Sequence, residues 1–65
     1  MKSAPKHLVI IPTYNELSNV VVLIPRLFKH IPDLSVLIVD DGSPDGTAEI
    51  CDGMRTQYPS LYVEK

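Results

Sequence analysis

The apolar residues of this chain occur in short unbroken runs, separated by polar segments rich in turn-forming residues. An apolar run without polar alternation is typical of a strand that is buried on both faces. The runs predict strands over residues 7–11, 35–39 and 61–63. Pro12 should end the first strand, because proline has no N–H to donate to a neighbouring strand.

Between the first two predicted strands, apolar residues recur every three to four positions, which is the spacing of an amphipathic helix. Ser18 or Asn19 is a suitable N-cap for this helix. We expect it to end near His30, and we expect a kink at Pro25, which removes one backbone hydrogen bond.

A second helical pattern follows the second strand and is closed by Pro59. Asp45 or Thr47 should cap it, and Cys51 should be a small core residue on its apolar face. Tyr58 and Tyr62 are expected to pack against the edge of the sheet. The order is therefore β-α-β-α-β, which predicts a parallel sheet with right-handed crossovers.

Polar clusters follow the first two predicted strands, at residues 12–16 and 40–47. Ligands of parallel sheets bind at the carboxyl ends of the strands. Neighbouring strands lie about 4.8 Å apart, so the two clusters should line one crevice. The pattern thus points to a site before any composition is considered.

Composition narrows the functional classes. The chain has 65 residues, a net charge of −2 and scattered basic residues, which argues against a general nucleic-acid binder. Cys51 is the sole cysteine, so no disulfide framework supports the core. The longest apolar run spans residues 20–24, far below the ~20 residues that cross a bilayer. His7 and His30 are isolated, and we interpret both as incidental.

For each polar cluster, two interpretations remain open. One carboxylate of the Asp40–Asp41 pair could face the crevice while the other holds a turn, or both could be turn residues. Tyr14 could stack on a base and Glu16 could accept from a ribose hydroxyl, or this segment could be a surface loop. The segment 42–47 matches no phosphate-binding fingerprint, and its carboxylates suit N–H and O–H donors better than phosphate.

Taken together, VIIPTYNE and LIVDDGSPDGT resemble the start of the glycosyltransferase family 2 domain, especially its dolichol-phosphate (polyprenol-phosphate) mannosyltransferase group. The resemblance implies an α/β fold: the parallel β-α-β-α-β portion of a Rossmann-like nucleotide-diphospho-sugar transferase, an α/β/α sandwich. Residues 1–6 would be a disordered tail. Residues 7–65 would be the incomplete, N-terminal nucleotide-binding part of the domain.

The resemblance also implies a hexosyltransferase that moves a sugar, most often mannose, from GDP-mannose or a UDP-sugar to a polyprenyl or dolichyl phosphate. The full-length protein would work at the cytoplasmic face of a membrane. It would use Mg²⁺ or Mn²⁺ on a later motif, so this chain would hold no metal ligand and no catalytic residue, and alone it would be inactive. The implied nucleotide-sugar-binding residues are Pro12, Tyr14, Glu16, Val39, Asp40 and Asp41.

Two rival functions follow from the same residues. A phosphoreceiver-like signalling domain also places an acidic pair after an apolar strand. In that class the pair follows the first strand, whereas Asp40 and Asp41 follow the second. A non-catalytic remnant is the other rival, and it should self-associate through unpaired strand edges.

Overall fold

The computed structural model describes residues 7–65, which form three strands and two helices. In chain order these are β1 (His7–Thr13), α1 (Leu17–His30), β2 (Leu34–Asp40), α2 (Thr47–Met54) and β3 (Leu61–Glu64). The predicted β-α-β-α-β order is therefore confirmed. The predicted disordered tail, residues 1–6, lies outside the described residues.

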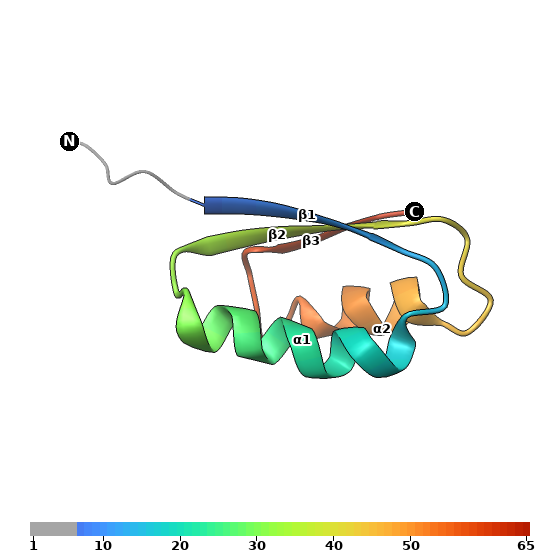
Figure 1. The fold of residues 1–65 in the computed structure, drawn as a ribbon, viewed down its shortest axis with the longest axis horizontal. Coiled ribbons are helices and arrows are strands. Elements are labelled where there is room, and N and C mark those ends of the chain that lie inside the picture. The colour runs from blue at the N-terminus through green and yellow to red at the C-terminus, as the bar shows by residue number, and fades with distance from the viewer. Residues whose placement is uncertain (1–6) are drawn as a thin grey trace.

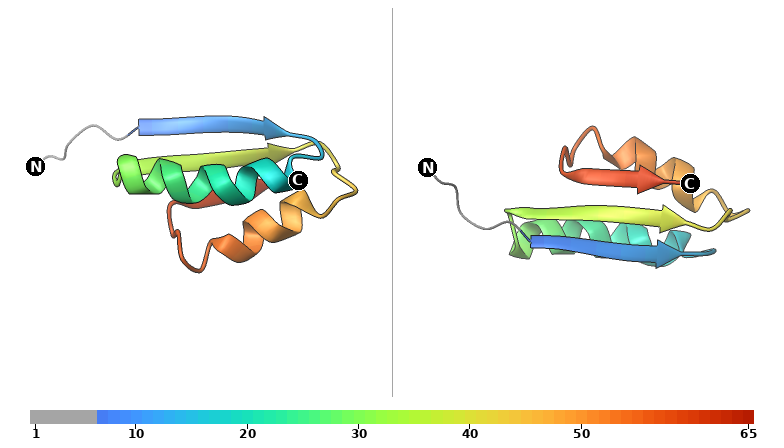
Figure 2. Two further views of the ribbon diagram at one scale, coloured as in Figure 1. Left: turned by 60° about the horizontal axis from the view of Figure 1, so that its bottom comes forward. Right: turned by 90° about the horizontal axis from the view of Figure 1, so that it is seen from above.

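The sheet is parallel, with strand order β1-β2-β3, and both helices lie against the same face (Figure 1). Two right-handed crossovers that step in the same direction put their helices on one side of a sheet. Seen from above, the three strands lie side by side with the helices behind them (Figure 2). The predicted α/β class is confirmed, and residues 7–65 supply one helical layer of the expected sandwich.

The core lies between the sheet and the helices. Alternate residues of β2 point toward the helices, so Leu34, Val36 and Ile38 are almost completely buried. Val20 and Ile24 of α1 pack against them. Cys51 of α2 is fully buried in the same cluster, as expected, and burial together with the nearby Asp40 charge raises the pKa of its thiol.

The other face of the sheet is apolar and uncovered by residues 7–65. Ile10 of β1 is in register with Leu37 of β2, which is in register with Tyr62 of β3. Ile10 is 58% exposed and Tyr62 is 47% exposed. The unbroken apolar runs predicted burial on both faces, and this part of the chain covers only one.

β1 does not end at Pro12, which corrects the predicted boundary. The strand continues to Thr13, and Pro12 is in register with Val39. The Thr13 carbonyl accepts from the Asp41 N–H on the β2 side, so the nitrogen of Pro12, one residue away, points to the free edge. A proline is tolerated there because no ladder bond is lost.

The tyrosines differ from their predicted places. Tyr58 follows α2 and stacks on Phe28 of α1, with ring centroids 5.0 Å apart and an interplanar angle of 13°. Tyr62 lies on the uncovered face of β3 rather than along its edge. α1 passes through Pro25 and ends at His30, as its periodicity predicts. Within the described residues, neither helix combines the length and apolarity needed to cross a bilayer.

Candidate functional site

Two loops meet at the carboxyl edge of the sheet (Figure 1). Loop A (residues 14–16) joins β1 to α1. Loop B (residues 41–47) joins β2 to α2 and includes Thr47, the first residue of α2. Thr13 and Asp40, the last residues of the two strands, are in register. The Asp41 N–H donates to the Thr13 carbonyl over 3.0 Å, so strand pairing carries the two loops to one place.

Asp40 is the acceptor at the centre of this junction. Its side chain points to the helix side and the residue is only 5% exposed. One carboxylate oxygen accepts from the Thr13 hydroxyl at 2.7 Å and the Ser43 hydroxyl at 2.6 Å, and the other accepts from the Ser43 N–H at 2.8 Å. The Ser43 hydroxyl and N–H, followed by Thr13, hold the pKa of Asp40 below its usual value, against the opposing effect of burial.

Loop B also closes the start of α1. The N–H of Asn15 donates to the Ser43 hydroxyl at 2.8 Å. The N–H of Glu16 donates to the Thr47 hydroxyl at 3.2 Å, and that of Leu17 donates to the Asp45 carboxylate at 3.3 Å. The first N–H groups of a helix have no partner within the helix, so these bonds act as a cap supplied from elsewhere in the chain.

This distant cap corrects the predicted N-cap. The cap position of α1 is Glu16, whose own side chain makes no capping bond, rather than Ser18 or Asn19. A side-chain cap is usually supplied by the residue that flanks the start of the helix in the sequence. In the structure the acceptors lie 28 to 31 residues further along the chain, and only folding brings them to the start of α1.

Asp45 holds the start of α2 as well. Its carboxylate accepts from the Thr47 N–H at 3.0 Å and from the Thr47 hydroxyl. These bonds, with the Thr47 hydroxyl first, lower the pKa of Asp45. Gly42 and Gly46 have φ values of 71° and 85°, which lie in the left-handed region that favours glycine. The N-cap position is Gly46, rather than the predicted Asp45 or Thr47, although the Asp45 carboxylate accepts from the first N–H of the helix.

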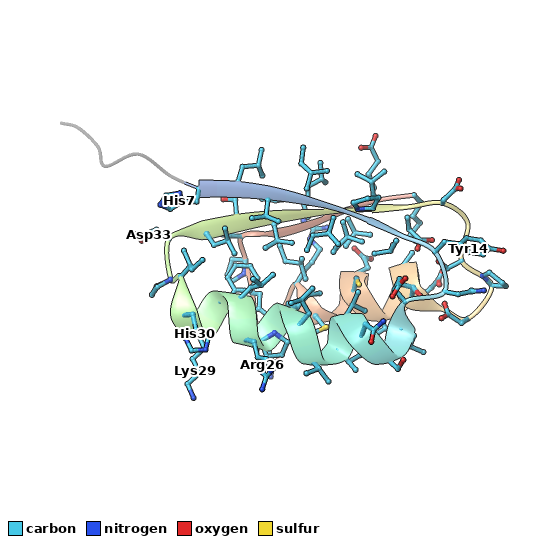
Figure 3. The ribbon with its side chains drawn as sticks, viewed as in Figure 1. His7, Tyr14, Arg26, Lys29, His30 and Asp33 are labelled. Carbon is cyan, nitrogen blue, oxygen red and sulfur yellow. The ribbon has the colours of Figure 1, made fainter. Side chains whose placement is uncertain are left out.

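Three of the predicted site residues remain available to a ligand. Tyr14 is 54% exposed, and its ring projects away from the sheet and helices (Figure 3). Asp41 is exposed and its carboxylate takes no part in the bonds between the loops. Glu16 is half-buried, and one of its oxygens accepts from the Asn19 amide at 2.6 Å.

Pro12 and Val39 lie next to these groups, on the uncovered face of the sheet. They are in register with each other at the last position of that face. Side chains alternate along a strand, so Asp41 continues on the side of Val39 whereas Asp40 faces the helices. His7 and His30 lie at the opposite end of the molecule from Tyr14 (Figure 3), away from both loops.

The shape of the edge differs from the expected crevice. Residues 7–65 enclose no pocket there, so the site is an open shelf. The amides at the start of α1 are already bonded to loop B, and therefore they are not free for a phosphate. In the same part of the chain no three carboxylate, histidine or cysteine side chains are grouped as metal ligands. Asp40 and Asp45 also bond to protein donors, so this donor set does not fit a divalent cation.

The sequence match decides the family. Residues 8–64 match the family described as Glycosyl transferase family 2. The chain belongs to this family. This family membership confirms the resemblance carried by the two motifs, and it favours a glycosyltransferase over the phosphoreceiver alternative.

Curated relatives of this family 2 chain are much longer proteins. It is 45% identical over 56 residues to "Undecaprenyl-phosphate mannosyltransferase" of Micrococcus luteus, covering 86% of this chain and 23% of that protein. It is 41% identical over 59 residues to "Polyprenol monophosphomannose synthase" of Mycolicibacterium smegmatis, covering 91% and 22%. It is 42% identical over 59 residues to "Dolichol-phosphate mannosyltransferase" of Pyrococcus furiosus, covering 88% and 17%. The chain thus spans less than a quarter of each relative, and no solved structure matches it significantly.

We predict that the chain loses stability in acid through Asp40 and Asp45. Both have a pKa lowered from 3.8, so their ionised forms stabilise the fold above that pH. This contribution disappears as the pH falls through the lower folded pKa values. In thermal unfolding followed by circular dichroism, the melting temperature should decrease as the pH is lowered below about 4. Asp40→Asn should melt lower than wild type at pH 7, with a smaller difference in acid.

Asp41→Asn is the matched control, because its carboxylate is outside the hydrogen bonds between the loops. Its free energy of unfolding should lie within about 0.5 kcal/mol of the wild-type value, as is usual for an exposed substitution. Equal melting of Asp40→Asn and wild type at pH 7 would contradict the assigned role of Asp40.

Proposed function

We propose that residues 7–65 bind the nucleotide part of a sugar donor in a polyprenyl-phosphate mannosyltransferase. Family membership supports transfer of a sugar, and the names of the three relatives given above support mannose and a polyprenyl phosphate acceptor. The single observation that carries the proposal is the division of carboxylates at the sheet edge. Asp40 and Asp45 bond within the protein, whereas Asp41 stays exposed beside Tyr14.

The free groups have the chemistry to hold a nucleoside. Tyr14 offers an exposed aromatic ring on which a base can stack. Glu16 keeps acceptor capacity for a ribose hydroxyl, since each carboxylate oxygen accepts two bonds. Pro12 and Val39 provide an apolar floor next to the loops. Asp41 accepts N–H groups at the edge of the base.

We infer that the donor is GDP-mannose rather than a UDP-sugar. Guanine presents two adjacent N–H donors on one edge, and a carboxylate can accept both at once. Uracil presents one N–H between two carbonyl oxygens, which a carboxylate repels. Two parallel charge-assisted bonds are stronger and more specific than one, so Asp41 should favour guanine.

We assign the remaining chemistry of the whole enzyme to residues other than 7–65. Loops A and B carry no lysine or arginine to bind a diphosphate, so we propose that Mg²⁺ or Mn²⁺ neutralises the diphosphate from another segment. The acceptor would be a polyprenyl phosphate at the cytoplasmic face of a membrane. The isolated chain should bind donor without transferring sugar, and it would supply no catalytic residue.

We also propose that the isolated chain self-associates. The Thr13 carbonyl points toward β2, and the backbone groups of successive strand residues point to opposite edges. Leu8 and Ile10 therefore direct their N–H and C=O groups to the free edge of β1. An unpaired edge beside an apolar face favours pairing with a second copy. Pro12 limits that pairing to the first part of the strand.

The donor site is tested by titrating ¹⁵N-labelled chain with GDP and with UDP. We expect GDP to bind more tightly, with amide shifts concentrated at residues 12–16 and 39–41. Tyr14→Ala should weaken GDP at least about fivefold, because stacking contributes roughly 1–3 kcal/mol per base. Asp41→Ala should weaken it similarly and abolish the preference over UDP.

Glu49→Gln, at an exposed position of α2, controls for the loss of one negative charge and should leave GDP affinity unchanged. Amide shifts confined to residues outside both loops, or a Tyr14→Ala chain that binds GDP as tightly as wild type, would contradict the site assignment.

Self-association is tested by sedimentation velocity over a range of micromolar concentrations. Wild type should shift toward dimer as concentration rises, and Ile10→Lys should stay monomeric because a charge on an edge strand opposes pairing. Val22→Lys, at a 54% exposed position of α1, controls for added charge. A wild-type chain that remains monomeric throughout would contradict the proposal.

A further inference from the structure

Loop B bonds to two backbone amides of loop A that lie between the side chains proposed to bind the nucleoside. Tyr14 and Glu16 flank Asn15, and the N–H groups of Asn15 and Glu16 bond to the Ser43 and Thr47 hydroxyls. Ser43 and Thr47 were not among the residues that the sequence assigned to the site. Ser43 is half-buried and Thr47 is fully buried, so neither is well placed to contact a ligand itself.

We propose that Ser43 and Thr47 are positioning residues of the nucleoside site, which set the directions of Tyr14 and Glu16 through the backbone of loop A. This inference rests on the proposed function, and it adds two residues that act without touching the nucleotide. They would raise affinity by ordering the loop before the ligand arrives.

The conformation of Asn15 is the first support. Its φ is 53°, in the left-handed region that residues other than glycine seldom occupy. Such a conformation persists where surrounding contacts hold it. The bond from Asn15 N–H to Ser43 is a contact that does so, at 2.8 Å. Without it, loop A would be free to relax and the ring of Tyr14 would change direction.

The direction of the hydroxyl bonds is the second support. A serine or threonine hydroxyl has one proton to donate. Ser43 donates its proton to Asp40, and Thr47 donates its proton to Asp45. Each oxygen therefore turns its lone pairs toward an N–H of loop A. The two carboxylates thereby fix both hydroxyls as acceptors, which makes the arrangement selective for this loop conformation.

The test compares GDP affinity in variants of the 65-residue chain by NMR titration, at a temperature where circular dichroism shows each variant folded. Ser43→Ala and Thr47→Val each remove one acceptor and should weaken GDP about fivefold, the effect of one hydrogen bond. Ser43→Thr and Thr47→Ser retain the hydroxyl and should restore affinity. The Tyr14 ring resonances of the free Ala and Val variants should shift and broaden.

Val20→Ala, a buried α1 substitution that leaves both hydroxyls in place, controls for a general loss of stability. It should lower the melting temperature yet leave GDP affinity and the Tyr14 resonances unchanged. Because Ser43 and Thr47 hold different amides, either variant suffices if the other does not fold.

The outcomes separate the two proposals. If wild type binds GDP and both acceptor-removing variants bind equally well, the positioning role is overturned and the nucleotide site stands. A Val20→Ala chain weakened as much as Ser43→Ala also overturns it. If wild type binds neither GDP nor UDP, the proposed function fails, and the positioning role fails with it.

Discussion

The buried carboxylate of Asp40 is the constraint on which the edge of this sheet depends. A charge with 5% exposure is costly unless donors surround it. The Thr13 hydroxyl is brought near by pairing of β1 with β2, and the two Ser43 donors are brought near by the turn of loop B. Satisfying one carboxylate therefore fixes the strand register and the loop at the same time.

The same contacts divide the polar residues into two groups with different roles. Asp40, Ser43, Asp45 and Thr47 bond to protein donors and form the frame that joins the loops. Tyr14 and Asp41 are left exposed on the side where the strands end. A motif rich in carboxylates is thus mostly structural, and Asp41, whose carboxylate bonds to no donor among residues 7–65, becomes the specific candidate for ligand recognition.

The sequence predicted the alternation of strands and helices because its unbroken apolar runs are local signals. For the Asp40–Asp41 pair it left two alternatives, one turn residue or two, and the structure gives the turn contacts to Asp40. Pro12 was misjudged because the tolerance of a strand for proline depends on which edge lies free. The cap of α1 was misjudged because its acceptors, such as Ser43, are near only after folding. Bonds across 28 or more residues leave no local pattern to read.

The central claim is that loop B caps the start of α1 and thereby orders loop A. Amide hydrogen exchange followed by NMR tests this claim directly. Ser18 is the internal reference, because its N–H donates no hydrogen bond to loop B. The account predicts that the amides of Asn15, Glu16 and Leu17 exchange markedly more slowly than that of Ser18. Equal, rapid exchange at all four positions would contradict it.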